Sequence, residues 1–144
     1  MSQISRSALV PYSAEQMFRL VNDVDAYPEF LPGCTGSRVL DSSEQQMTAS
    51  VDVSKAGISK TFVTRNTLSN NKSIQMQLVD GPFRKLTGGW QFTELSEDAC
   101  KVELNLEFEF TNMLVEMAFG RIFKELASSM VQAFTKRAKE VYSA

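Results

Sequence analysis

The sequence contains no histidine and only two cysteines, and these absences exclude much of the usual chemistry of active sites. Without histidine the chain cannot build a Ser-His-Asp triad, a Cys-His pair or a histidine metal site. Cys34 and Cys100 stand far apart, in no spacing typical of a metal site, so reduced cytosolic thiols are expected. We therefore expect neither a metal nor an obligatory cofactor.

A carboxylate or lysine mechanism would still need a base inside a cavity. Asp52 and Glu103 alternate outward with the polar faces of their predicted strands. The orientation of Lys60 stays open, because Phe62 indicates one face and Val63 the other. No spacing of carboxylates indicates a preorganised acid and base, so we expect a protein that is not an enzyme.

Long apolar runs are also missing. No run approaches the ~20 residues that a helix needs to cross a bilayer, and residues 1–6 lack the apolar stretch of a secretory signal. Hydrophobic residues make up 43% and charged residues 22% of the 144 residues, which is typical of a globular domain. We expect one cytoplasmic domain over residues 1–144 that does not span a membrane, as a monomer or weak dimer.

Charge is distributed unevenly along the chain. The net charge of −2 argues against a generally basic nucleic-acid-binding protein. Between Lys55 and Lys85, however, six basic residues accompany the single acid Asp80, whereas between Glu94 and Glu109 six acids accompany one lysine. This polarity either orients the protein on a phosphate-rich partner or reflects two groups of strands whose solvated faces differ in sign.

The first part of the chain predicts a strand and a short helix. Ile4–Val10 has the pattern of a strand, which Pro11 stops. Ser13 and Gln16 form a capping-box signature, and apolar residues behind them recur at helical spacing. The helix must be short, because the two prolines and the glycine of Tyr27–Gly33 forbid a long regular element.

The remainder predicts a sheet and a long helix. From Thr35 to Phe110 apolar and polar residues alternate, which indicates six further strands of an antiparallel sheet with one wet face. Asn112 is the expected N-cap of a helix ~45 Å long, whose apolar stripe must cover the apolar face of the sheet. Its outer face is supplied by Arg121, Lys124, Glu125, Lys136, Arg137, Lys139 and Glu140.

Four motifs stand in order along the chain: Tyr27–Cys34, Phe62–Asn66, Asp80–Leu86 and Gly89–Phe92. The first resembles the YPxFLPxC segment of the coenzyme Q-binding proteins of bacteria and mitochondria, and the others match further blocks of that family. Together with the element order, they make the chain similar to the START-like helix-grip proteins of the polyketide cyclase and coenzyme Q-binding family. The expected fold is α+β, a seven-stranded curved antiparallel sheet wrapped around a long C-terminal helix, with short helices after the first strand.

Within this family, Pro32–Arg38, Val51–Lys60 and Phe119–Arg121 resemble a branch of bacterial toxins. That resemblance implies an inhibitor of translation that binds the large (50S) ribosomal subunit and blocks its association with the small subunit. A small antitoxin protein would be a further partner. The wider family implies an alternative, a protein that binds ubiquinone or another isoprenoid lipid and supports respiratory electron transport.

Apolar side chains are the candidates for a ligand cavity between the long helix and the sheet. A prenyl tail needs mainly buried apolar area, worth about 25 cal/mol per Å². The same side chains are equally well explained as ordinary packed core. The candidates are Tyr27, Phe30, Leu31, Phe62, Leu78, Phe83, Trp90, Phe108, Phe119 and Phe123.

Basic side chains are the candidates for contact with ribosomal RNA, since Arg and Lys hold phosphates without reading sequence. The turn Asp80–Phe83 is either a proline-set turn or a device that projects residues 83–85 toward the cavity mouth or toward RNA. A cluster at residues 136–139 is the second choice, although basic residues also suit a helix C-terminus. The preferred set is Lys55, Lys60, Arg65, Arg84 and Lys85.

Overall fold

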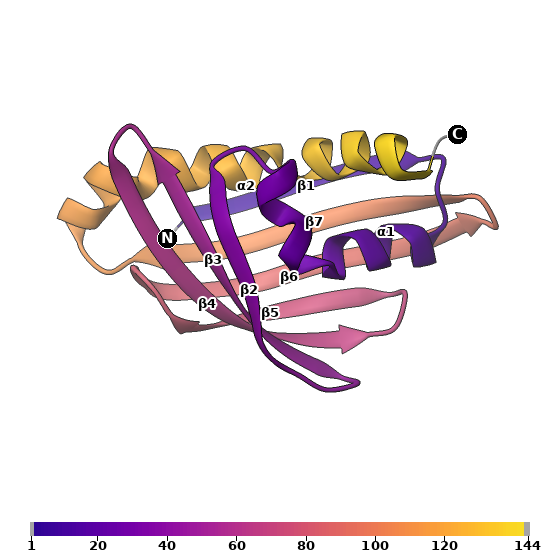
Figure 1. Ribbon diagram of the computed structural model, residues 1–144, viewed down its shortest axis with the longest axis horizontal. Coiled ribbons are helices and arrows are strands. Elements are labelled where there is room, and N and C mark those ends of the chain that lie inside the picture. Colours follow the sequence, from indigo (N-terminus) through magenta and orange to yellow (C-terminus); the bar gives the residue numbers. More distant parts are fainter. Residues whose placement is uncertain (1, 143–144) are drawn as a thin grey trace.

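The computed structural model describes residues 2–142, which form a mixed α+β domain. In chain order the elements are β1 (Ser2–Val10), α1 (Ala14–Asn22), the 3₁₀ helix η1 (Val24–Glu29), β2 (Cys34–Ser42), β3 (Gln46–Lys55), β4 (Ile58–Ser69), β5 (Ser73–Asp80), β6 (Phe83–Ser96), β7 (Ala99–Phe110) and α2 (Met113–Tyr142). Figure 1 shows α2 lying along one face of the sheet. The predicted helix-grip architecture is confirmed.

The strands within residues 2–142 form one seven-stranded sheet in the order β1-β7-β6-β5-β4-β3-β2. All neighbouring strands are antiparallel, and β1 pairs with β7 from Ser2 opposite Phe108 to Val10 opposite Cys100. The alternation of the sequence explains the two faces. On β7, for example, every second residue from Cys100 to Phe110 is buried on the inner face, toward α2.

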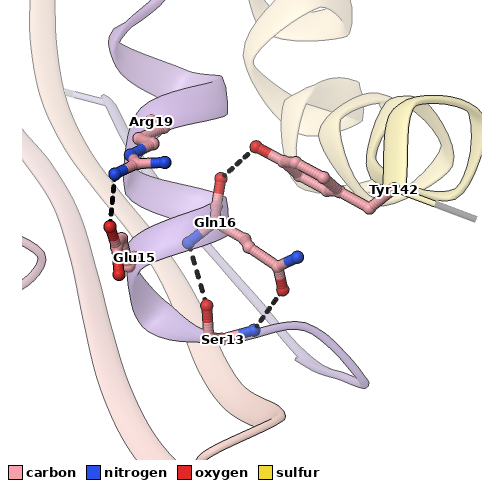
Figure 2. Close-up of polar contacts among 5 residues, drawn as sticks. All are labelled: Ser13, Glu15, Gln16, Arg19 and Tyr142. Atoms are coloured by element: carbon pink, nitrogen blue, oxygen red, sulfur yellow. Dashed lines mark hydrogen bonds and ion pairs between the residues drawn. The ribbon is translucent and has the colours of Figure 1, made fainter.

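Helix α1 begins with the predicted capping box, which Figure 2 shows. The Gln16 main-chain N–H donates to the Ser13 hydroxyl at 3.1 Å, and the Ser13 N–H donates to the Gln16 side-chain oxygen at 2.9 Å. An ion pair between Arg19 and Glu15 lies one turn further on. The Tyr142 hydroxyl donates to the Gln16 carbonyl at 2.9 Å, so the end of α2 is fastened to the start of α1.

The core lies between the inner face of the sheet and α2. Its largest fully buried side chains include Trp90, Phe108, Phe119 and Phe134. The helix has 30 residues, and Asn112 caps it by accepting a hydrogen bond of 3.0 Å from the Val115 N–H. Because one amphipathic helix covers most of the apolar sheet, the space left under α2 is the natural place for a cavity.

Candidate functional site

A partly open cavity of about 60 Å³ lies between the inner face of the sheet and α2. Its walls come from η1, strands β3 to β7 and the middle of α2, and they are mostly apolar. The lining residues are Val24, Tyr27, Leu31, Ala49, Val51, Phe62, Thr64, Asn66, Met76, Leu86, Trp90, Leu106, Phe123, Leu126, Ala127 and Met130. The volume accommodates a few water molecules, whereas sites for drug-sized ligands are usually about 300–1,000 Å³.

Five of the ten predicted cavity residues line this space: Tyr27, Leu31, Phe62, Trp90 and Phe123. The buried Tyr27 hydroxyl donates to the Val21 carbonyl, and burial raises the pKa of Tyr27 well above its usual value. The hydroxyl of Tyr27 therefore stays neutral and bonded to the backbone. The part of Tyr27 that lines the cavity is its aromatic ring.

The other five predicted cavity residues lie elsewhere. Phe83, Phe108 and Phe119 belong to a buried aromatic cluster at one end of the core, in which the Phe83 and Phe123 ring centroids are 4.8 Å apart. Leu78 is half-buried on β5 and packs against the core. Phe30 packs against Phe134 and lies under the Arg137 guanidinium, 5.1 Å from its ring centroid. The interpretation as ordinary packed core describes Phe83, Phe108 and Phe119, whereas Leu78 and Phe30 are partly buried at the margin of the core.

Two polar residues of the cavity, Thr64 and Asn66, were not among the predicted site residues. Both lie on the inner face of β4, where they are 5% and 6% exposed. The Thr64 hydroxyl donates to the Asn66 side-chain oxygen at 2.9 Å. The sequence carries a signal for them, because Phe62, Thr64 and Asn66 share one parity on a strand whose inner positions are otherwise mostly apolar.

The preferred basic set is not gathered on one face. Lys60 lies opposite Val53 and has the same parity as Phe62, so it lies at the inner side of β4 and is half-buried. Arg65 lies on the outer face, opposite Thr48 and Gln77. The orientation of Lys60 that the sequence left open is thereby resolved, and it separates Lys60 from Arg65.

Three members of the set have carboxylate partners. The Lys55 ammonium is 2.7 Å from Glu125 on α2, the Arg84 guanidinium is 4.0 Å from Glu109, and the Lys85 ammonium is 3.5 Å from Glu107. In the last two pairs, the neighbouring strands β6 and β7 bring the end of the basic segment against the acidic segment. The pKa of the Glu125 carboxyl is lowered, chiefly by its hydrogen bond to Lys55 and by the charges of Lys55 and Arg121.

The solvent face of α2 carries four basic residues that make no direct ion pair within the described residues 2–142. Arg121, Lys124, Lys136 and Lys139 are exposed, and within residues 2–142 none has a carboxylate oxygen within 4.0 Å. At 100° per residue the four lie within an arc of about 120° of the helix. Helical spacing placed them on the outer face, but the lack of partners is visible only in the structure. We call these four residues the α2 basic stripe.

Arg137 differs from its neighbours, although the sequence assigned it to the same outer face. Its guanidinium lies 3.1 Å from Glu29 and 4.0 Å from Glu140, and it stacks on Phe30. Of the second-choice cluster, Lys136 and Lys139 are therefore free to contact a partner, whereas Arg137 holds the loop after η1.

The start of α2 exposes a small apolar patch beside the α2 basic stripe. Met113, Leu114 and Met117 are 74–77% exposed. In Figure 1 this end of α2 projects beyond the ends of the strands. Exposed apolar groups next to unpaired charges are typical of a contact surface.

Comparison with known proteins identifies the family. Residues 10–135 match the family described as polyketide cyclase / dehydrase and lipid transport. The chain belongs to this family. The predicted branch is confirmed as well, because the chain is 74% identical over 144 residues to the ribosome association toxin RatA of Escherichia coli (strain K12), covering all of this chain and 91% of that one. The RatA of Vibrio cholerae serotype O1 is 69% identical over 142 residues, with 99% of each chain covered.

The chain is also similar to more distant proteins. A mitochondrial relative, the coenzyme Q-binding protein COQ10 homolog B of Xenopus laevis, is 29% identical over 144 residues, covering 97% of this chain and 59% of that one. The 18 kDa protein CC1736 from Caulobacter crescentus is 31% identical with a TM-score of 0.76, and each chain is covered completely. The Zhui aromatase/cyclase of Streptomyces sp. R1128 has a TM-score of 0.87 at 14% identity, covering 99% of this chain and 96% of that one.

Metal-binding and membrane-spanning features are both missing from the described part of the chain. Among residues 2–142, no cluster of three or more His, Cys, Asp or Glu side chains is arranged to hold a metal ion. Over the same range, no helix has the length and apolar character needed to span a membrane.

Proposed function

We propose that this protein binds the large (50S) ribosomal subunit and blocks its association with the small subunit. Relatives that carry the name ribosome association toxin, at up to 74% identity over the whole chain, support the proposal. Under this proposal the protein acts in the cytoplasm, without catalysis, by occupying a surface that the other subunit needs.

The observation that carries the mode of binding is the α2 basic stripe. Four unpaired cations on one face of a rigid helix match a phosphate-rich surface, and they contact it through charge and shape rather than base sequence. Arg84 and Lys85 are a weaker choice, because Glu109 and Glu107 each lie beside one of them, whereas the acid within the arc of the α2 basic stripe, Glu125, is already paired with Lys55. We therefore assign the ribosome-facing surface to the solvent face of α2, with Met113, Leu114 and Met117 at its end.

The test is sedimentation of the purified protein with separated 30S and 50S subunits at two salt concentrations. Wild-type protein should migrate with 50S and reduce the amount of 70S. The double variant Arg121→Glu/Lys124→Glu should bind more weakly. Its log affinity should also fall less steeply with log salt, the slope being smaller by about one for each phosphate that the variant no longer binds.

The matched control is Arg84→Glu/Lys85→Glu, which changes the net charge by the same amount on the β6–β7 side of the molecule. It should bind like wild type. Loss of binding in this control but not in the α2 variant would move the interface to the sheet. Absence of wild-type protein from the 50S fractions at low salt would contradict direct binding.

A second candidate function is binding of ubiquinone or another isoprenoid lipid. The mostly apolar lining of the cavity favours it, and one relative is named as a coenzyme Q-binding protein. A cavity of about 60 Å³ does not hold a prenyl chain unless lining side chains move apart. Native mass spectrometry of protein mixed with ubiquinone tests this candidate, and it is rejected if no complex survives at low salt.

A further inference from the structure

We propose that Met113 and Met117, at the start of α2, form a site of reversible oxidation, and that its oxidation weakens binding of the partner that contacts the solvent face of α2. The modification is the conversion of each thioether to a sulfoxide by a peroxide. The effect on binding rests on the proposed contact with the 50S subunit, whereas the modification itself does not.

Met113 and Met117 differ in exposure from the other methionines of the described residues. They are 74% and 77% exposed, whereas Met17 and Met47 are 0% and 4% exposed. The two remaining methionines, on β5 and in the middle of α2, are partly buried against the core. Figure 1 shows that the start of α2 projects beyond the ends of the strands. A peroxide in solution therefore reaches the sulfurs of Met113 and Met117 without any opening of the fold.

The two cysteines are poor competitors for the oxidant. Peroxides react with a thiolate rather than with a protonated thiol. Cys34 and Cys100 are buried, and burial raises the pKa of each thiol, so both stay protonated near neutral pH. The Cys34 thiol also donates to the Gly36 carbonyl at 3.5 Å. The thioethers of Met113 and Met117 are therefore the most accessible oxidisable sulfur atoms among residues 2–142.

The oxidation step uses only the sulfur atom and the oxidant. A lone pair of the thioether sulfur attacks one oxygen of hydrogen peroxide, so that an S–O bond forms as the O–O bond breaks. The proton of the transferred hydroxyl passes to the leaving oxygen, and the products are the sulfoxide and water. Sulfur loses two electrons and the peroxide gains them. Methionine sulfoxide reductases reverse the step with a dithiol, which is oxidised to a disulfide while the oxygen leaves as water.

Both sulfurs lie on the side of α2 that carries the α2 basic stripe. At 100° per residue, Met117 and Leu114 fall within the arc of the stripe, and Met113 lies about 20° outside it. A surface that binds the stripe therefore also covers these three side chains. A sulfoxide is polar where the thioether is apolar, and burying a polar group without a new hydrogen bond is unfavourable. Oxidation therefore opposes binding.

Oxidation at these two positions spares the fold. Neither Met113 nor Met117 belongs to the core, so a polar sulfoxide in their place meets solvent in the free protein. Oxidation of the fully buried Met17 would instead place a polar group in the core. The modified protein should therefore unfold at the same urea concentration as the reduced protein, and the change should appear in binding alone.

The oxidation site is tested by treating the folded protein with hydrogen peroxide for increasing times and mapping its tryptic peptides by mass spectrometry. Met113 and Met117 share one tryptic peptide, residues 102–121, and every other methionine falls in a different one. Fragment ions then locate each added oxygen. Met113 and Met117 should be oxidised roughly 10-fold faster than Met17 and Met47, because oxidation follows exposure. Equal rates, or earlier oxidation of a cysteine, would overturn the site.

The effect on binding is tested by sedimentation with 50S subunits after the peroxide has been removed. Oxidised wild type should bind roughly 10-fold more weakly than reduced wild type, the factor expected for burying one poorly compensated polar group. Treatment with methionine sulfoxide reductases and dithiothreitol should restore the reduced affinity. Restoration separates the proposed modification from irreversible damage.

Two double variants complete the test, and circular dichroism verifies that each is folded. Met113→Leu/Met117→Leu has no oxidisable sulfur at the site, so its affinity should be the same before and after peroxide treatment. Met113→Gln/Met117→Gln places a polar side chain of similar length there, and it should bind as weakly as oxidised wild type.

Three outcomes would count against the effect on binding. Oxidised wild type could bind as tightly as reduced wild type, or the leucine variant could lose affinity on the same treatment. Either result would overturn a role for Met113 and Met117. If reduced wild type does not migrate with 50S, the proposed function fails and the effect on binding fails with it. The peptide map still decides the oxidation site in that case.

Discussion

The guanidinium of Arg137 lies over the ring of Phe30, 5.1 Å from its centroid. Arg137 belongs to α2, whereas Phe30 follows η1 in the proline-bounded segment that leads into β2. The same guanidinium is 3.1 Å from Glu29. One side chain of the long helix therefore fastens this segment, which carries Tyr27 and Leu31, over one end of the cavity.

Replacing Arg137 by Gln should lower the free energy of unfolding by about 1–2 kcal/mol, because the substitution removes both a partly desolvated cation–π interaction and the ion pair with Glu29. Urea unfolding provides the measurement. Lys136→Gln, one residue earlier and exposed, should change stability by no more than about 0.5 kcal/mol. Equal effects of the two substitutions would show that the stacked position has no special role.

Phe134→Ala should be among the most damaging core substitutions. Phe134 is fully buried and contacts Tyr27, Phe30 and Trp90 edge to face, with ring centroids 5.1–5.3 Å apart. The expected loss of stability is about 3–5 kcal/mol, the usual range for Phe→Ala in a core. Because Trp90 is the sole tryptophan of the sequence, its emission reports this region and should move to longer wavelength as water enters. Leu114→Ala, in the exposed first turn of helix α2, is the control. It should leave the unfolding free energy and the Trp90 emission wavelength nearly unchanged.

Gly88 and Gly57 both have a positive φ, but they differ in the space available to an added Cβ. At Gly88, with φ +133°, an added Cβ would lie 2.1 Å from the Asn105 carbonyl oxygen on the neighbouring strand. At Gly57, with φ +82°, it would meet nothing within 4 Å. Gly57→Ala should cost about 1–2 kcal/mol from backbone strain, and Gly88→Ala should cost more than about 3 kcal/mol because β6 and β7 must separate. Thermal or urea unfolding distinguishes the two, and similar costs would argue against close strand approach at Gly88.

Stability should fall at alkaline pH partly through Cys100. Burial raises the pKa of its thiol from 9.0 to about 11. Since the folded pKa exceeds the unfolded one, the thiol's contribution is complete below pH 9 and is lost as pH rises toward 11. Cys100→Ala should therefore show a shallower decline of unfolding free energy between these pH values. An identical decline in both proteins would assign it to other groups, among them Tyr27 and Cys34, whose pKa values burial also raises.

Local patterns predicted the elements well. The capping box of Ser13 and Gln16, the alternation of β7 and the cap at Asn112 each depend on residues close together in the chain, so the sequence shows them directly. The face occupied by Lys60 and the neutralisation of Lys85 by Glu107 depend on strand register and pairing. A shift of one residue in register would move every side chain to the opposite face.

The site was predicted less completely, for the same reason. Aromatic residues of the inner face are recognisable in the sequence, but which of them border an empty volume depends on how α2 sits on the sheet. Thus Phe62 and Phe123 line the cavity, whereas Phe83 and Phe108 are packed on all sides. The unpaired state of Lys124 likewise depends on residues distant in sequence, because only tertiary structure shows which carboxylates are near.

The pairing of β1 with β7 has a consequence for how the chain acquires its structure. Ser5 on β1 bonds to Asn105 on β7, 100 positions away along the chain. Strand β1 can pair only once β7 is available, and the inner face of the sheet is covered only once α2 packs on it. Contacts of such long range delay the rate-limiting step of folding. During synthesis, a nascent chain that ends before residue 99 therefore lacks its β7 partner and presents an unpaired edge together with an uncovered apolar surface, the combination that chaperones recognise and that promotes aggregation.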